Sequence, residues 1–153
     1  MAGRKLSKHW FLRQIVFLQN RKEKMDLPKQ VIHRASGTSE HVQQFGPYKI
    51  EPLLTEAEES AATAYRVRVE PHQQTTTSYH LVAEEFYFVL TGTGTAVLDG
   101  ESRALRPGDF LRLPPGTRHA FVTLDEPLEM LDVHVPGCRP DRDAYFVEDS
   151  EDE

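Results

Sequence analysis

Two histidines and one glutamate near the middle of this chain have the types and spacing of ligands for one divalent metal ion. His80 and Glu85 lie within residues 78–92, and His119 ends a second stretch, residues 108–119. Two imidazoles and one carboxylate leave other coordination positions open, as a catalytic metal requires. The set suits non-haem Fe(II), and Mn, Zn and Ni also accept these ligands. A metal held there would act as a Lewis acid, activate bound water, or orient oxygen and substrate.

The chain must bend for these side chains to meet. His80 and Glu85 are five residues apart, so on one continuous strand they would face opposite sides. Residues 81–84 leave room for a turn between them. Glu85 would then begin a new strand, and His119 would begin a later one directly after a Pro-Pro-Gly turn.

Two further residues share faces with the expected ligands. Ser78 is two residues from His80, and Tyr87 is two residues from Glu85. We expect both hydroxyls beside the metal, where Ser78 would orient a bound water or a substrate oxygen. Glu84 is an alternative to Glu85 as the carboxylate ligand, and we favour Glu85.

The remaining pattern predicts an all-β fold in which short strands are separated by turn residues. Asp99-Gly100 is a strong signal for a two-residue hairpin. With no long helical pattern, such strands indicate an antiparallel sandwich or barrel, and a jelly roll closes it naturally. Val31 and Ile32 also suggest a strand start, and residues 55–64 predict either a helical turn capped by the pair Thr55 and Glu58 or a polar loop. The strands are expected at residues 48–54, 65–69, 85–90, 95–98, 102–105, 110–113, 119–124 and 128–135, with a last edge segment at 145–147.

The strand at residues 128–135 can be oriented in two ways. We expect its apolar set, Leu131, Val133 and Val135, to face the core, which leaves His134 exposed. In the opposite orientation His134 becomes a candidate acid or base. Four arginines are predicted to be outward strand charges, although any of them could instead clamp a substrate carboxylate: Arg66, Arg68, Arg112 and Arg118.

Length and charge limit the domain organisation and the partners. A chain of 153 residues predicts one domain, which we place at residues 28–147, between a basic leader, residues 1–27, and an acidic disordered tail, residues 148–153. The net charge is -6, and the first 24 residues carry seven Lys or Arg against one Glu. The acidic remainder disfavours nucleic acid as a partner. A small molecule is the expected partner.

The leader and the single cysteine bear on localisation. The leader suits a basic surface helix, an organelle transit peptide, or sequence upstream of a native start at Met25; we favour a disordered or weakly helical leader with that start. Cys138 is the only cysteine, which excludes an internal disulfide and a multi-cysteine zinc site. No apolar run approaches the roughly 18 residues of a membrane span. These features favour a cytoplasmic protein without membrane attachment.

The two stretches resemble the paired motifs of the cupin superfamily, G-x5-H-x-H-x3or4-E-x6-G and G-x5-P-x-G-x2-H-x3-N. The resemblance covers roughly residues 48–136. His72 and Ser78 depart from the first motif, where the family has Gly and the first metal-binding His, and Thr123 takes the place of Asn in the second. The matching residues are His80, Glu85 and Gly92 in the first motif and Gly108, Pro114, Gly116 and His119 in the second.

The resemblance implies a double-stranded β-helix barrel, commonly a homodimer, with a metal in its mouth. Cupins usually bind metal through three His and one Glu, and some cupin enzymes use two His and one Glu. The leading hypothesis is therefore a metal-dependent dioxygenase or isomerase acting on a small polar organic substrate. In the alternative hypothesis, Ser78 marks a metal-free binding or sensor module. In a third hypothesis, the protein has a structural or partner-binding role carried by its charged ends.

Overall fold

The computed structural model describes residues 31–35, 40–59 and 61–147. The predicted leader, residues 1–27, and the predicted acidic tail, residues 148–153, lie outside these ranges. Val31 and Ile32 form no strand, so that prediction is wrong. Within the described residues, no helix has the length and apolar character needed to cross a membrane.

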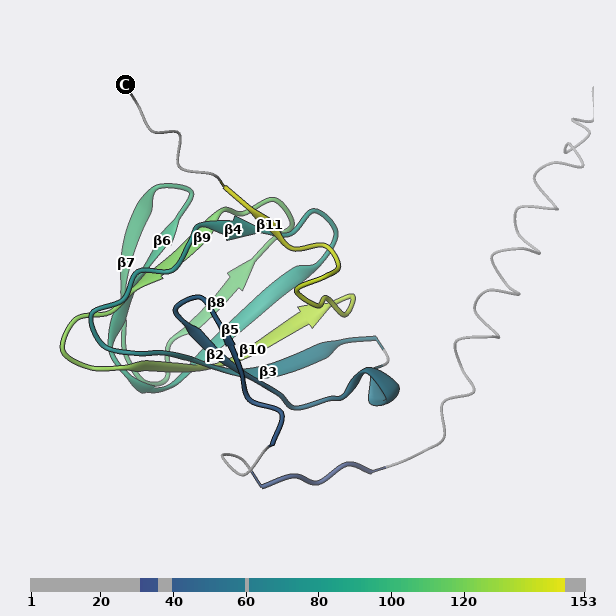
Figure 1. Ribbon diagram of the computed structural model, residues 1–153. Helices are drawn as coiled ribbons and strands as arrows, with labels where there is room; N and C mark the ends of the chain where they lie inside the picture. Colours follow the sequence, from purple (N-terminus) through teal and green to yellow (C-terminus); the bar gives the residue numbers. More distant parts are fainter. Residues whose placement is uncertain (1–30, 36–39, 60, 148–153) are drawn as a thin grey trace, which may run out of the picture. The chain divides into compact units, whose positions relative to one another are not determined.

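From residue 40 onward, two antiparallel sheets face each other in a jelly roll, as predicted (Figure 1). The six-stranded sheet has the order β1 (Gln43–Phe45), β2 (Tyr48–Pro52), β3 (Thr63–Val69), β10 (Leu128–Val135), β5 (Glu84–Gly92) and β8 (Phe110–Leu113). The five-stranded sheet has the order β11 (Tyr145–Phe146), β4 (Ser78–Tyr79), β9 (His119–Val122), β6 (Gly94–Leu98) and β7 (Glu101–Leu105).

Local turn chemistry explains the hairpin between β6 and β7. Asp99 and Gly100 have φ angles of 48° and 88°, and Leu98 pairs with Glu101 across them. A tight hairpin that matches the twist of its strands needs positive φ at both central residues, which suits an Asp-Gly pair. The predicted hairpin is confirmed.

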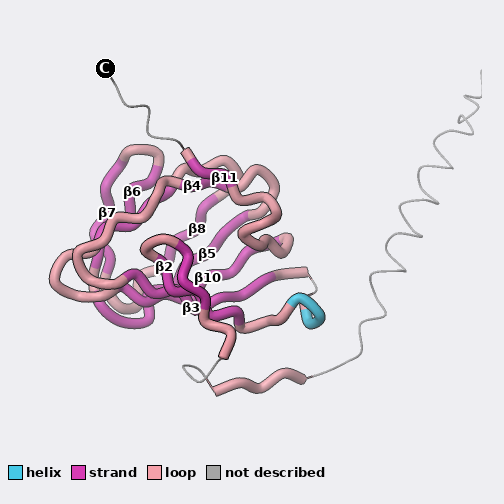
Figure 2. Tube along the Cα trace, viewed as in Figure 1, coloured by secondary structure: helices cyan, strands magenta, loops and turns pink. Residues whose placement is uncertain are grey.

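One short helical turn, η1 (Glu56–Glu58), interrupts the strands in the described part of the chain (Figure 2). The Glu58 carboxylate accepts hydrogen bonds from the Thr55 backbone N–H and hydroxyl, both at 2.8 Å. This is the capping arrangement that the sequence predicted. Arg34 adds an ion pair with Glu58 at 2.7 Å.

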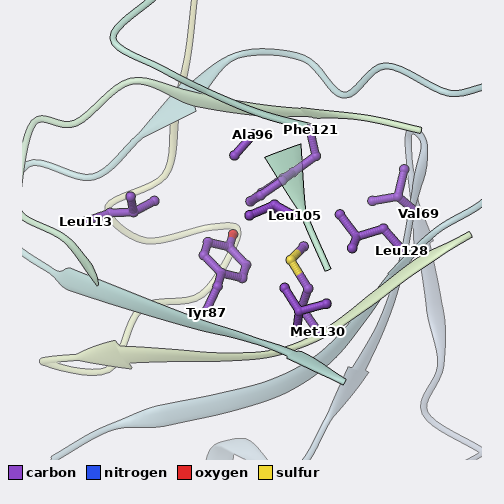
Figure 3. Packing of buried hydrophobic residues seen from close by; sticks show 9 residues of the cluster. Val69, Tyr87, Ala96, Leu105, Leu113, Phe121, Leu128 and Met130 are labelled. Carbon is purple, nitrogen blue, oxygen red and sulfur yellow. The ribbon is translucent and has the colours of Figure 1, made fainter. Parts of the chain in front are cut away.

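The hydrophobic core lies between the two sheets and receives residues from both. Figure 3 shows Met130 from β10 pointing toward Leu105 from β7 and Phe121 from β9. Phe121 and Met130 are fully buried, and burial of each such side chain contributes about 1.5–3 kcal/mol to folding. The full cluster is Val69, Tyr87, Val89, Ala96, Leu105, Leu113, Phe121, Leu128 and Met130.

The inward rows of β5 and β10 change from apolar to polar along their length. In β10 the buried row runs from Leu128 and Met130 in the core to Asp132 and His134. In β5 the corresponding row runs from Val89 through Tyr87 to Glu85. One end of the space between the sheets is therefore a packed core, and the other end gathers ionisable groups.

Candidate metal centre

The structure brings together the three side chains that the sequence singled out. Glu85 lies in β5, His119 begins β9, and His80 follows the last residue of β4. One ligand atom from each lies within 4.8 Å of the others, and all three residues are buried. Glu85 Oε2 is 3.6 Å from His80 Nε2 and 3.2 Å from His119 Nε2.

The bend that joins His80 to Glu85 is held by the side chain of Asp143. Its two carboxylate oxygens accept the backbone N–H groups of Leu81, Val82 and Ala83 at 2.9, 3.0 and 2.8 Å. Burial would raise the pKa of Asp143, but these hydrogen bonds outweigh it and lower that pKa. The turn expected at residues 81–84 therefore exists, and a distant acidic residue fixes it.

Hydrogen bonds to backbone carbonyls set the tautomers of both histidines. His80 Nδ1 lies 2.6 Å from the Asp143 carbonyl oxygen, and His119 Nδ1 lies 3.1 Å from that of Thr117. A carbonyl only accepts, so each Nδ1 carries the proton. In the neutral imidazoles this leaves the Nε2 lone pairs on the side of Glu85. Metal-ligating histidines are commonly oriented by such bonds.

In the ion-free protein, His80 and Glu85 attract each other. Burial alone would lower the pKa of His80, but Cys138 and Glu85 outweigh burial and raise that pKa to about 11. Burial would raise the pKa of Glu85, but the three neighbouring histidines hold that pKa well below its usual range. Binding of a metal would therefore displace a proton from His80.

The two oxygens of Glu85 have different environments. Oε1 accepts a hydrogen bond from His134 Nε2 at 3.0 Å. Oε2 is buried and has no hydrogen-bond partner among the residues that the structure describes. A buried carboxylate oxygen without a hydrogen bond is costly, and this one lies beside two imidazole nitrogens. The donor set therefore fits a divalent cation.

His134 and Asp132 face inward, so the predicted orientation of residues 128–135 is wrong. Each is only 5% exposed, and His134 pairs directly with Glu85 across the β10 and β5 ladder. Asp132 Oδ1 lies 3.5 Å from His134 Nδ1. Burial, followed by the charge of Glu85, raises the pKa of Asp132 well above its ordinary value. Asp132 and His134 alternate with apolar residues along β10, but apolar residues occupy both faces of the strand, so this pattern did not decide between the two orientations.

Ser78 and Tyr87 both lie next to the three candidate ligands. The Ser78 hydroxyl is 3.2 Å from His119 Nε2, and the two residues pair across β4 and β9. The Tyr87 ring makes an edge contact with His119, with ring centres 6.2 Å apart. Burial and the charge of Glu85 raise the pKa of Tyr87 well above its ordinary value, so its hydroxyl stays protonated.

Glu84 does not share this site. Its carboxylate pairs with Arg112 of β8, and it is partly exposed. Adjacent residues of a strand point to opposite faces, so the side chain of Glu84 must point outward when that of Glu85 points inward. Between the two carboxylates, the geometry favours Glu85.

The three candidate ligands line a pocket that is open to solvent. Phe45 of β1 and Phe146 of β11 line it, and their ring centres are 5.7 Å apart. These strands are the outer strands of the two sheets, so the pair closes one side between them. The remaining wall is mostly apolar and aromatic, with Tyr48, Ile50, Tyr65 and Val67.

Two pocket residues follow β10 and had no site role in the sequence analysis. The Cys138 thiol lies 3.4 Å from His80 Nδ1 and donates to the Arg142 carbonyl at 2.9 Å. Arg139 also lines the pocket, whereas the four arginines considered from the sequence do not. Both residues lie in an irregular segment, where no periodic pattern indicated an inward position.

Comparisons with known proteins agree with this architecture. Residues 65–134 match the cupin domain model. A segment of 59 residues, 39% of this chain, is 37% identical to quercetin 2,3-dioxygenase of Bacillus subtilis but covers 18% of that protein. A segment of 73 residues, 47% of this chain, is 33% identical to an uncharacterized protein of Methanocaldococcus jannaschii and covers 53% of it. The chain thus spans about half or less of these curated relatives.

Solved structures extend the likeness beyond that segment. A sugar phosphate isomerase from the cupin superfamily of Silicibacter pomeroyi superposes with a TM-score of 0.54 and 27% identity, over 67% of this chain and 66% of that one. The Streptomyces protein PAC13, solved with uridine, superposes with a TM-score of 0.64 over 77% of this chain and 92% of that one; at 19% identity it shows the fold alone. Residues 65–134 therefore match the cupin domain, and the fold around them is similar to that of a solved protein of the cupin superfamily.

Proposed function

We propose that this protein binds one divalent metal ion through His80 Nε2, Glu85 Oε2 and His119 Nε2 and is a metal-dependent enzyme. The observation that carries the proposal is Glu85 Oε2, a buried oxygen without a hydrogen bond beside two imidazole nitrogens. Fe, Mn, Zn and Ni all accept this ligand set. The substrate is a small organic molecule in the adjoining pocket, and the reaction is a dioxygenation or an isomerisation.

The surrounding residues keep the three ligands in place. Backbone carbonyls fix the two imidazoles, and His134 holds Glu85 by its other oxygen. Such supporting bonds orient ligands and raise their basicity. When bound, the ion would supply Lewis acidity or, if it is iron, redox chemistry with dioxygen. The hydroxyls of Ser78 and Tyr87 would orient the substrate.

The relatives support the reaction classes without selecting one. The Bacillus subtilis relative is named as a dioxygenase, and the Silicibacter pomeroyi structure is named as a sugar phosphate isomerase. Cupins share one barrel across many chemistries, so the substrate depends on the pocket.

Metal analysis of purified protein tests the proposal. The wild type, His80→Ala and Glu85→Gln would be reconstituted with Fe(II), Mn(II), Zn(II) or Ni(II), desalted and analysed by mass spectrometry of the metal. His72→Asn is a matched control, because His72 is exposed and pairs only loosely with Asp125, at 3.7 Å. We expect about one ion per chain in wild type and control and at least a tenfold loss in the two site variants. Equal, near-zero occupancy in all four proteins would remove the proposal.

One observation favours a second candidate, a metal-free binding or sensor module. The Ser78 hydroxyl donates to His119 Nε2 at 3.2 Å, and that nitrogen is the atom a metal would need. In such a module the ionisable cluster would bind a polar group of the ligand directly. Near-zero metal in the wild type, together with ligand binding that chelator leaves unchanged, is the result that distinguishes this function.

Homodimer formation and a cytoplasmic location remain predictions. Light scattering of the full chain tests the dimer, and fractionation of the native host tests the location.

A further inference from the structure

A partly buried arginine, Arg139, lines the pocket and has one buried guanidinium nitrogen without a hydrogen bond from the described residues. Arg139 Nε donates to Glu59 Oε2 at 2.6 Å, and the side chain is 14% exposed. Its Nη2 is buried and has no hydrogen-bond partner in the described part of the chain. Leaving a charged donor buried and unpaired costs more than leaving a neutral one. This nitrogen therefore favours an acceptor.

The charges around Arg139 do not cancel. Glu59 Oε2 also accepts from Arg142 Nη2, at 3.0 Å. One carboxylate thus faces two guanidinium groups, and Glu56 adds only a weaker attraction for Arg139. The cluster that Glu59 forms with the two arginines carries an excess positive charge.

Close packing fixes the backbone on either side of this arginine. A Cβ at Gly137 would lie 2.8 Å from Glu59 Oε1, so glycine allows the segment to approach that carboxylate. The Cys138 carbonyl accepts the hydroxyls of Thr63 and Tyr65 at 2.8 and 2.9 Å. These contacts hold the arginine before any ligand binds, which lowers the entropic cost of binding.

We propose that the pocket binds a small organic acid, with its anionic group on Arg139 and its hydrophobic body against Phe45 and Phe146. The inference rests on the proposed function, because it specifies the substrate class of the same site. Arg139 supplies a charged donor and Phe45 and Phe146 supply aromatic surface in the same pocket, and together they fit an acid with a hydrophobic body. Carboxylate and phosphate share this chemistry, since guanidinium binds both.

Three probes of similar size separate the contribution of the anionic group to binding from that of the aromatic ring. They are benzoate, phenyl phosphate and the neutral benzamide. Their affinities would be measured by calorimetry on the full chain, both metal-free and metal-loaded. We expect one or both anions to bind about tenfold or more tightly than benzamide, as expected for a hydrogen bond between charged groups. The stronger anion distinguishes carboxylate from phosphate recognition.

Variants assign the preference to one arginine. Arg139→Gln should abolish the preference for the anion and leave benzamide binding unchanged, while Arg139→Lys should retain part of it. Arg142→Gln is the matched control, because Arg142 pairs with the same Glu59 oxygen but is half exposed. It should keep the wild-type preference. The melting temperature of each variant verifies its fold.

Three results would overturn the inference. They are equal binding of anion and amide by the wild type, wild-type preference in Arg139→Gln, and no anion binding up to about 10 mM, a concentration that corresponds to negligible affinity. Measurement on metal-free protein separates this inference from the metal proposal. An Arg139-dependent preference there, with no metal bound by the wild type, would support the acid site and reject the metal site.

Discussion

His134 on β10 lies directly opposite Glu85 on β5, and His134 Nε2 is 3.0 Å from Glu85 Oε1. The bond occupies one carboxylate oxygen and leaves Oε2 beside the other two imidazoles. Both residues are almost fully buried, so water cannot replace the bond. The histidine that the sequence analysis placed on the surface thus orients the central carboxylate.

Replacement of His134 should weaken metal binding without abolishing it. His134→Leu removes the donor to Glu85 Oε1, and loss of such a supporting bond typically lowers metal affinity by about 10–100-fold. His134→Gln can still donate and should recover part of the affinity. Competition with a chromophoric chelator measures both. Unchanged affinity in His134→Leu would show that Glu85 needs no support from β10.

Addition of a third imidazole should strengthen the site. Ser78 already faces His119 Nε2 at 3.2 Å, so a longer side chain there can reach the ion. We expect Ser78→His to bind metal at least about tenfold more tightly than the wild type does. An added ligand should contribute no less to metal affinity than a hydrogen bond that supports a ligand. Ser78→Ala is the control and should bind no more tightly than wild type. The same chelator competition measures it; identical affinities for Ser78→His and wild type would place Ser78 outside the coordination sphere.

Two glycines with similar backbone angles should tolerate alanine differently. Gly92 and Gly100 have φ angles of 78° and 88°. A Cβ at Gly92 would lie 1.7 Å from the Pro127 carbonyl oxygen, whereas one at Gly100 would meet nothing within 4 Å. Gly100→Ala should therefore cost only backbone strain, about 1–2 kcal/mol, and Gly92→Ala should cost more than about 3 kcal/mol. Urea denaturation compares them, and equal losses would contradict the close approach of Pro127.

The Glu58 carboxylate should make stability depend on pH in acid. Its hydrogen bond with Arg34, followed by those with Thr55, lowers the pKa of Glu58 from 4.5 to about 2. Because the folded pKa is the lower one, the stabilisation is complete above about pH 4.5 and is lost as the pH falls toward 2. The melting temperature of the wild type should therefore approach that of Glu58→Gln over this range.

A control for this effect is Glu56→Gln, which removes a charge from the same turn but leaves the Arg34 pair in place. Its difference from the wild type should change less between pH 4.5 and 2. If both variants showed the same pH dependence, the Arg34 pair would not be the cause.

Local signals were sufficient to predict the fold. The Asp-Gly pair determines its hairpin through backbone angles that only a few residues adopt, and the other turns are similarly rich in Gly and Pro. Strands between such turns pair antiparallel with little ambiguity, so the jelly roll could be predicted from the order of strands and turns. Val31 and Ile32 misled because two β-branched residues without partners do not make a strand.

The site was less predictable because two of its parts depend on tertiary contacts. Apolar residues occupy both faces of β10, so alternation alone could not orient Asp132 and His134. Their inward position is stabilised by the buried hydrogen bond to Glu85, which no local pattern shows. Arg139 lies in an irregular segment, where periodicity gives no direction. The turn between His80 and Glu85 was predicted, but its support by Asp143 joins residues about 60 positions apart.

The most direct test of the metal centre is a crystal structure of wild-type protein purified from cells grown without added metal. Anomalous scattering on both sides of the Fe, Mn, Zn and Ni absorption edges would identify the ion. We predict one anomalous peak within bonding distance of His80 Nε2, Glu85 Oε2 and His119 Nε2. A well-ordered site without such a peak, even after the crystals are soaked in each of the four metals, would contradict this prediction.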